Sequence, residues 1–401
     1  GALSAAAYHA CLPDYLAHIG VAYNDVILAC TFTLALLAGD RFVRRPCARR
    51  GALAGVCVGL AFGSKFSALL LGPIALGVVL LEACARRDRR SWALALIKHG
   101  ALGLLSLYLT LVLIERGDLA LALWRAGLEW TLNPSLRRIM PSYYLGALRP
   151  GSGVFFLIAY AVKLPLAAHA LVGVGVALFA RARWRTRRGW RRWLRAPWRA
   201  PLCGVLLLVV VFARSEVNNG LRYALPAFPL LALWLGPVWA RAWRRARPAG
   251  RWALGALWAG AIGAALAAYP HFLGYMNALV PVERRNWVLV ESSLDWGQGL
   301  VELREYLREE GYPAVSLAYF GSAAPASYGI VYRPLPSFLD IPPVDGVPPG
   351  PLPVAVSATL LSGLYLPGDL YAAYRDERPI AVLAGGSLLV YAPREDPLGP
   401  Q

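Results

Sequence analysis

Charged residues are scarce in this chain, and carboxylates are the scarcer kind. Only 16% of the 401 residues are Asp, Glu, Lys or Arg, whereas a soluble globular domain carries roughly 25%. The mean hydropathy is +0.49. Residues 1–269 contain 9 acidic against 33 basic side chains, while residues 270–401 contain 14 acidic and 8 basic ones. The shortage of charge excludes a purely soluble protein, and the change of sign indicates two regions in two environments.

Signatures of several enzyme classes are also absent. The chain has no HExxH sequence, no P-loop, no dinucleotide-binding glycine pattern and no Ser-His-Asp arrangement with supporting spacing. Its six cysteines form no CxxC pair and are interpreted as small buried hydrophobes, and its five histidines are scattered. The sequence predicts no specific cofactor, but it leaves open the binding of a divalent metal ion.

Apolar runs fill the first 269 residues. A membrane-spanning helix needs about 20 apolar residues. Two of the runs, Gly51–Phe62 and Leu202–Ala213, are shorter and would cross only a thinned region, and residues before Asp14 look like the end of one more span. The sequence predicts about eight spans besides this partial one: Asp25–Phe42, Gly51–Phe62, Phe66–Ala83, Trp92–Ile114, Val154–Ala180, Leu202–Ala213, Tyr223–Ala240 and Trp252–Ala268.

Positive charge marks one set of connections between these spans. Arg41–Arg50, Arg86–Lys98 and Arg241–Arg251 hold five basic residues each, and Arg181–Arg199 holds nine. The alternate connections hold few, apart from Glu115–Pro150 with five. By the positive-inside rule the basic connections are cytoplasmic, which places residues 270–401 outside the cytoplasm. Basic bursts between apolar runs are typical of membrane proteins and argue against a nucleic-acid partner.

The Arg181–Arg199 run interleaves tryptophan with arginine. Such a pattern forms either an interfacial helix on anionic lipid or a long cytoplasmic connection with topological charges. The charge asymmetry already accounts for the run, which favours the second interpretation.

Residues 270–401 are typical of a small α/β domain. The stretch Leu300–Glu310 places Leu300, Leu303 and Leu307 at helical spacing with charged residues opposite. Strand and helix patterns in alternation predict an α/β fold, and the length is adequate for a core of its own. The predicted strands, separated by Pro- and Gly-rich turns, are Trp287–Glu291, Val315–Tyr319, Leu352–Val356, Ile380–Leu383 and Ser387–Tyr391.

Four charged residues lie at span ends on the side away from the cytoplasm: Asp25, Lys65, Lys163 and Arg222. Ionisable groups at membrane depth are costly and mark function, and cations at one face suit a lipid phosphate. Structural interpretations also exist, with Asp25 as a helix N-cap, Lys65 as a helix C-cap and Lys163 as a snorkelling side chain. The convergence of all four on one face favours a functional site.

Six stretches of the chain resemble bacterial members of glycosyltransferase family 39, relatives of the dolichyl-phosphate-mannose protein mannosyltransferases and of the aminoarabinose transferase of lipid A. They run in order across nearly the whole chain: LPDYLAHIGVAYNDV, GLAFGSKFSALLLGP, YYLGALRPGSGVFFLIAYAVKLPLA, NNGLRYALPAFPLLAL, LVESSLDWGQGLVELREYL and AYFGSAAPASYGI. The resemblance implies a polytopic α-helical membrane protein of the GT-C fold, with residues 1–269 as its transmembrane region. It also implies a location in the bacterial inner membrane, with residues 270–401 as a small periplasmic α/β domain.

What the resemblance implies for the site is residue-specific. Lys65, Lys163 and Arg222 with Tyr223 match the basic positions expected to hold the phosphate of a polyprenyl-phosphate-linked sugar. Asp25 matches an acidic position and is expected to be a supporting acid. The family's catalytic carboxylate lies in the first outer loop, which would precede Gly1, so we expect the catalytic residue upstream of this chain and activity only in a longer protein.

The implied reaction is transfer of the sugar, with inversion, to a protein, lipid or glycan acceptor. In LDWGQ, Asp295, Trp296 and Gln298 either contact the acceptor or a glycan, since tryptophan stacks on sugars, or form a strand-to-helix turn with Asp295 capping the helix. The competing class is a non-catalytic membrane protein, either a transporter or a scaffold that displays the exported domain. The chain shows no internal repeat of the kind transporters carry.

Overall fold

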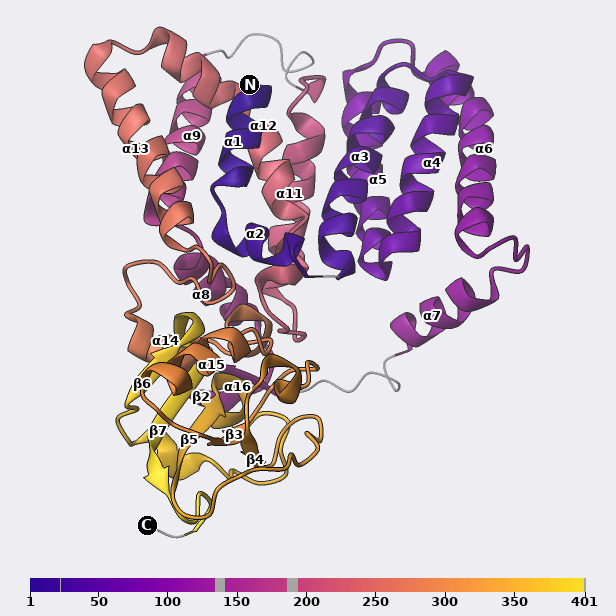
Figure 1. Ribbon diagram of the computed structural model, residues 1–401. Helices are drawn as coiled ribbons and strands as arrows, with labels where there is room; N and C mark the ends of the chain where they lie inside the picture. Colours follow the sequence, from indigo (N-terminus) through magenta and orange to yellow (C-terminus); the bar gives the residue numbers. More distant parts are fainter. Residues whose placement is uncertain (22, 134–140, 186–193, 400–401) are drawn as a thin grey trace. The chain divides into compact units, whose positions relative to one another are not determined.

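The computed structural model describes residues 1–21, 23–133, 141–185 and 194–399. They form two compact units (Figure 1). Unit 1 comprises Gly1–Arg138, Ala167–Arg214 and Tyr223–Ile262, and unit 2 comprises Ile139–Leu166, Ser215–Arg222 and Gly263–Gln401. The chain is mostly helical, with a small sheet in its C-terminal part.

Unit 1 is built of helices at the predicted spans. Its core lies between α3, α5, α11 and α12, where Phe32, Leu36, Ile74, Leu208 and Leu230 are buried together. The helices that lie wholly or mostly in this unit are α1 (Ala2–Ala10), α2 (Pro13–Ile19), α3 (Asn24–Arg44), α4 (Ala48–Ser64), α5 (Leu71–Ala85), α6 (Arg89–Ile114), α7 (Ala122–Leu132), α9 (Leu166–Arg185), α11 (Arg199–Ala213), α12 (Ala227–Arg245) and α13 (Pro248–Ala267).

Three of the described helical segments are long and apolar enough to cross a membrane: Asn24–Arg44, Phe66–Ala85 and Arg89–Ile114. The second joins the 3₁₀ turn η1 (Phe66–Leu70) to α5. The predicted span Val154–Ala180 is broken into α8 (Gly153–Lys163) and α9 at Leu164 and Pro165, because proline cannot continue a helix from the residues before it. If these two count as one span, there are four. The prediction of eight spans therefore stays a prediction.

Apolar side chains are exposed along α6. Ile97, Leu104 and Leu113 are each at least 70% exposed. In water such a surface is unusual for a monomer, and in a bilayer it faces lipid of matching polarity. Helix α6 packs on α4 (Figure 1). A Cβ added at Gly51 or Gly55 would meet the α6 backbone, so the two helices are in close contact there.

Unit 2 contains a five-stranded mixed sheet in the order β4-β3-β5-β7-β6. Strand β3 pairs in parallel with β4 and β5, and β7 pairs antiparallel with β5 and β6. The helix α15 (Leu300–Glu309) buries Leu300, Leu303 and Leu307 in the same core as residues of the sheet, as predicted. The strands are β3 (Val315–Ala318), β4 (Tyr332–Pro334), β5 (Leu352–Ser357), β6 (Ala381–Leu383) and β7 (Leu388–Arg394).

One predicted strand is wrong. The stretch Trp287–Glu291 forms the end of α14 (Arg285–Val288), a single bridge from Leu289 to Tyr144, and the start of the 3₁₀ turn η5 (Glu291–Ser293). Val288, Leu289 and Val290 are buried whereas Trp287 is exposed, and a short buried apolar run does not distinguish a helical turn from a strand. The strand β4 was not predicted.

Unit 2 also takes in two separate segments from before residue 270, and its last segment begins at Gly263. The hairpin β1 (Ser142–Tyr144) and β2 (Ala147–Arg149) and the helix α8 belong to it, as do residues 215–222. The segments are tied together by Asn218, whose Oδ1 accepts from the Ser152 N–H at 2.6 Å and whose Nδ2 donates to the Ser152 carbonyl at 2.8 Å. The compact unit thus includes residues that the predicted boundary at 270 assigns to the transmembrane region.

Candidate functional site

Asp25, Lys65 and Tyr223 come together in unit 1, and we refer to them as the Asp25–Lys65–Tyr223 cluster. Asp25 lies in the first turn of α3 and is 1% exposed. Its Oδ1 accepts a hydrogen bond from Lys65 Nζ in an ion pair. The same ammonium lies 4.2 Å from the centroid of the Tyr223 ring, within cation–π range.

Local backbone structure positions the two charges. Lys65 is an extended residue between the end of α4 and the turn η1, with φ −168° and ψ 143°. The chain end of α4 is fixed to α3, because Asn24 Nδ2 donates to the Ser64 carbonyl at 3.0 Å. The side chain of Lys65 keeps 19% of its surface exposed. A cation held by a buried carboxylate and an aromatic face is therefore still accessible to a ligand at this end of α3 and α4.

The capping interpretation of Asp25 is wrong. The N-cap residue of α3 is Tyr23, and no side chain makes a capping hydrogen bond there. Asp25 lies inside the first turn, where its charge also interacts favourably with the positive end of the helix dipole. The C-cap interpretation of Lys65 is confirmed for its backbone, since Lys65 is the C-cap of α4 and its N–H donates to the Ala61 carbonyl.

Lys163 lies in unit 2 at the end of α8 and has no exposed surface. Its Nζ donates to the carbonyls of Leu273 at 2.6 Å and Ser293 at 2.8 Å. A buried ammonium requires such partners, because desolvation without them is costly. The snorkelling interpretation is therefore wrong: the ammonium points into the protein and ties α8 to the later part of the chain.

Arg222 and Trp296 come together in unit 2. The guanidinium carbon of Arg222 lies 4.8 Å from the centroid of the Trp296 ring, and its Nε donates to the Asn219 carbonyl at 2.9 Å. Arg222 is 7% exposed. The preceding Gly220 has φ +83°, and a Cβ there would lie 2.2 Å from Ser292 Oγ, so the turn requires glycine. The sequence predicts both residues as site residues but does not predict that they touch.

Asp295 and Gln298 shape the turn that carries Trp296. Asp295 accepts from the N–H groups of Gly297 and Thr359, both at 3.1 Å. Gln298 Oε1 accepts from the Trp296 N–H at 2.8 Å, and its Nε2 donates to the Leu294 carbonyl at 2.7 Å. The segment is a turn before α15, but the predicted strand-to-helix turn with Asp295 as the cap is wrong: η5 and not a strand precedes it, and α15 begins five residues after Asp295 with Gly299 as its N-cap and no side-chain cap.

Burial governs the electrostatics of this turn. Asp295 is 1% exposed, and desolvation raises the pKa of its carboxyl to about 7. The two backbone N–H donors lower the pKa in part, and the charge of Glu291 raises it. Desolvation also raises the pKa of Tyr319, whose hydroxyl donates to the Gly297 carbonyl at 2.6 Å. Asp295 therefore changes its charge near neutral pH.

A second set of charges was not predicted as a site. Arg199, 2% exposed, donates from Nε to Asp40 at 2.8 Å and from Nη1 to Glu82. Asp40 and Glu82 are both buried, near the ends of α3 and α5. The sequence does contain a signal for this cluster. Asp40 and Glu82 are isolated carboxylates next to arginine-rich connections, and membrane topology alone requires only positive charge there.

Metal ligands are not gathered anywhere in the part of the chain that the structure describes: no group of three or more His, Cys, Asp or Glu side chains could hold an ion there. The divalent metal stays a prediction. The predicted cytoplasmic run Arg181–Arg199 falls partly on residues 186–193, outside the described residues.

Comparison with known proteins returns no relative. No family model matches the chain, and neither a curated protein nor a solved structure matches it.

Proposed function

We propose that this chain is the membrane-embedded body of a glycosyltransferase that takes its sugar from a polyprenyl-phosphate donor. The observation that supports the proposal is the Asp25–Lys65–Tyr223 cluster, with a buried carboxylate and a partly exposed ammonium. It lies at one end of α3, whose apolar length suffices to cross a membrane. Charges at such a depth are costly, so they mark a ligand site more often than a structural device.

The chemistry assigns separate tasks to cation and carboxylate. An acceptor hydroxyl or amine attacks the anomeric carbon, the bond from that carbon to the phosphate oxygen breaks, and the polyprenyl phosphate leaves with the electron pair. The Lys65 ammonium stabilises the negative charge on the leaving phosphate. The proton of the acceptor goes to a carboxylate acting as general base, and Asp25 serves as a supporting acid that orients Lys65.

Arg222 is the second cation of the proposal. Its guanidinium stacks on Trp296 and is anchored through Nε, which holds the planar group in one orientation for phosphate oxygens. Lys163 has a different task, because both of its hydrogen bonds to backbone carbonyls hold unit 2 together. Lys65 in unit 1 and Arg222 in unit 2 are therefore each proposed as a phosphate contact, and Lys163 supports the fold of unit 2.

The proposal includes a location. The arginine-rich connections face the cytoplasm, the protein crosses the bacterial inner membrane several times, and the sheet of unit 2 lies in the periplasm. The acceptor, whether protein, lipid or glycan, meets the donor at the outer face.

Transfer assays on the natural full-length protein test the function. Membranes that contain it are supplied with a panel of polyprenyl-phosphate sugars, and sugar transfer is measured for Lys65→Ala and Lys65→Arg. Loss of one charge-assisted contact of about 1.5–3 kcal/mol lowers donor use roughly ten-fold or more. We expect Lys65→Ala to lose that much and Lys65→Arg to retain part of the activity.

Lys98→Ala is the matched control, since Lys98 is an exposed lysine in α6 at the arginine-rich end. It should transfer sugar at the rate of the unsubstituted protein. If a correctly inserted protein transfers no sugar from any donor, the transferase proposal fails in favour of a non-catalytic protein that displays unit 2.

A further inference from the structure

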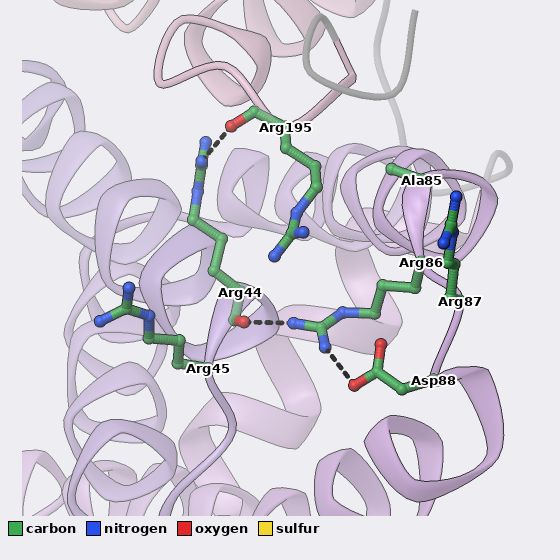
Figure 2. A pocket seen from close by; sticks show the side chains of 7 residues that line it. All are labelled: Arg44, Arg45, Ala85, Arg86, Arg87, Asp88 and Arg195. Atoms are coloured by element: carbon green, nitrogen blue, oxygen red, sulfur yellow. Dashed lines mark hydrogen bonds and ion pairs between the residues drawn. The ribbon is translucent and has the colours of Figure 1, made fainter. Parts of the chain in front are cut away.

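An open pocket of about 680 Å³ lies in unit 1 at the other end of α3 from the Asp25–Lys65–Tyr223 cluster. Figure 2 shows the side chains that surround it. Its lining consists of Ala85, Asp88 and five arginines at positions 44, 45, 86, 87 and 195. Its size falls within the roughly 300–1,000 Å³ of small-molecule sites, and its wall is almost entirely of one charge.

Two of the arginines are fixed parts of the wall. Arg44 donates from Nε to Asp40 at 2.6 Å, and its terminal nitrogens donate to the Arg195 and Ala196 carbonyls. Arg86 donates to Glu82 at 2.9 Å, to Asp88 at 3.1 Å and to the Arg44 carbonyl. All three nitrogens of each guanidinium are used, so these side chains hold the pocket in shape.

The other three arginines have donors to spare. Arg195 contacts Glu82 through Nε at 3.2 Å, and Figure 2 shows its guanidinium pointing into the space between Arg44 and Arg86. Its two terminal nitrogens have no partner within residues 1–21, 23–133, 141–185 and 194–399. The guanidinium groups of Arg45 and Arg87, both exposed, likewise make no ion pair to any described residue.

The charges of the pocket do not balance. With Arg199 beneath it, the cluster contains six arginines, and the acids that pair with them are Asp40, Glu82 and Asp88. Topology requires arginines in the cytoplasmic connections, and arginines near helix ends also suit the C-terminal dipoles of α3 and α5. Neither effect requires them to surround one cavity, where like charges repel one another until an anion enters.

We propose that this pocket binds a phosphate group, either a phospholipid headgroup or a soluble phosphate. Guanidinium groups match phosphate oxygens in bidentate geometry. Arg195, Arg45 and Arg87 supply the donors, and Arg44 and Arg86, each fixed by three hydrogen bonds, hold the pocket in shape. The pocket adjoins the ends of Asn24–Arg44 and Phe66–Ala85, two segments long enough to span a bilayer, which puts it within reach of lipid headgroups, while its open mouth admits soluble anions.

Binding measurements on the full-length protein test the site. Calorimetric titration with inorganic pyrophosphate in detergent probes the soluble source. Mass spectrometry of lipid retained after reconstitution, with zwitterionic lipid alone or mixed with phosphatidic acid, probes the lipid source. The pocket variant is the triple substitution Arg45→Ala, Arg87→Ala and Arg195→Ala. Each lost contact costs roughly ten-fold in affinity, so we expect at least that loss.

The control variant removes the same charge from outside the pocket: Arg49→Ala, Arg90→Ala and Arg241→Ala, three exposed arginines of the basic connections. If the pocket variant, and not the control, loses pyrophosphate binding, the ligand is a soluble phosphate. If the pocket variant, and not the control, loses retained phosphatidic acid, the ligand is a lipid headgroup. Equal losses in both variants, or no binding by the unsubstituted protein, overturn the proposal.

Folding failure is separated from binding loss. The double substitution Arg45→Ala and Arg87→Ala leaves every described ion pair intact and should unfold at the temperature of the unsubstituted protein. If this double variant binds as tightly as the unsubstituted protein, the two exposed arginines are not ligands and the site as proposed is wrong.

Discussion

Lys163 and Asp295 are both buried, and backbone groups are among the partners of each. The ammonium of Lys163 donates to two carbonyls, and the carboxyl of Asp295 accepts from two N–H groups. Backbone partners satisfy a buried polar group without neutralising its charge. Lys163 and Asp295 are consequently sensitive to substitution, and Asp295 is also sensitive to pH.

Asp295 should make the stability of the protein depend on pH. Its pKa is raised by burial from 3.8 to about 7, so the folded protein holds this proton more tightly than the unfolded chain. As pH rises from about 4 to about 7, ionisation of Asp295 lowers the free energy of unfolding by on the order of a few kcal/mol. Above about pH 7 this destabilisation stays constant. Asp295→Asn removes this slope.

Thermal unfolding of both proteins across this pH range measures the effect. The difference in melting temperature between Asp295→Asn and the unsubstituted protein should shift in favour of the variant between pH 4 and pH 7. Asp345→Asn, at an exposed aspartate of the same unit, should follow the unsubstituted protein. If the melting temperatures of Asp295→Asn and of the unsubstituted protein change in parallel with pH, the raised pKa assigned to Asp295 is wrong.

Substitutions at Arg222 should show whether this residue binds a phosphate or only anchors its segment. Arg222→Ala should lower donor use roughly ten-fold or more, and Arg222→Lys should recover only part, because lysine keeps the charge without the bidentate fork. Donor KM and kcat are the measurements. The exposed Arg214 supplies the control, Arg214→Ala, with unchanged kinetics expected. Full recovery by lysine would assign Arg222 an anchoring role only.

For single residues, the sequence predicts which side chains are candidates for a site better than it predicts which of them come into contact. Asp25 and Lys65 are 40 positions apart and were predicted at one membrane face, yet their ion pair depends on how α3 and α4 end. Interpretations of single residues were wrong where the side chain bonds to a residue distant in sequence and not to a local group. Lys163 finds carbonyls from residues 273 and 293, which no local pattern around position 163 reveals.

Among the elements of unit 1, α4 and α6 approach each other closely. Gly51, Gly55 and Gly59 repeat at four-residue spacing on α4 and so share one face. A Cβ at Gly55 would lie 1.9 Å from the Gly103 carbonyl oxygen of α6, and one at Gly51 would lie 2.3 Å from that of His99. Small residues that let two helix backbones meet are a main source of association between membrane helices.

Two alanine substitutions separate packing from helix propensity. Gly55→Ala should destabilise the protein by about 1–3 kcal/mol through overpacking. At Gly100, also in a helix, a Cβ would meet nothing within 4 Å, so Gly100→Ala should be neutral or stabilise by up to about 1 kcal/mol. Unfolding midpoints in detergent measure both. Equal effects would show that the backbones do not touch at Gly55.

Element prediction succeeded where one pattern dominated. Long apolar runs and the leucine spacing of α15 correspond to helices in the structure. It failed for Trp287–Glu291, because a short buried apolar run fits either a strand or a helical turn, and it missed β4, because Tyr332–Pro334 is too short to show a pattern. The break between α8 and α9 follows from Pro165, which could have been predicted.

For the molecule as a whole, orientation in the membrane is the prediction on which the proposed site depends. Fusions after Ala246, within a basic connection, should be fluorescent with green fluorescent protein and inactive with alkaline phosphatase. Fusions after Ala268 should show the reverse, because the intervening apolar segment reverses the side. A cytoplasmic signal after Ala268 would invert the topology and place the Asp25–Lys65–Tyr223 cluster inside the cell.

The discontinuity of unit 2 has a consequence for the order of synthesis. The hairpin β1–β2 and α8 leave the ribosome more than a hundred residues before Leu273 and Ser293, whose carbonyls hold Lys163, and β7 follows later still. During that interval the Lys163 ammonium lacks those acceptors. Translation therefore passes through a stage in which α8 has been made but these acceptors have not, and a ribosome that stalls before residue 273 leaves a chain in which Lys163 has neither of these two carbonyls.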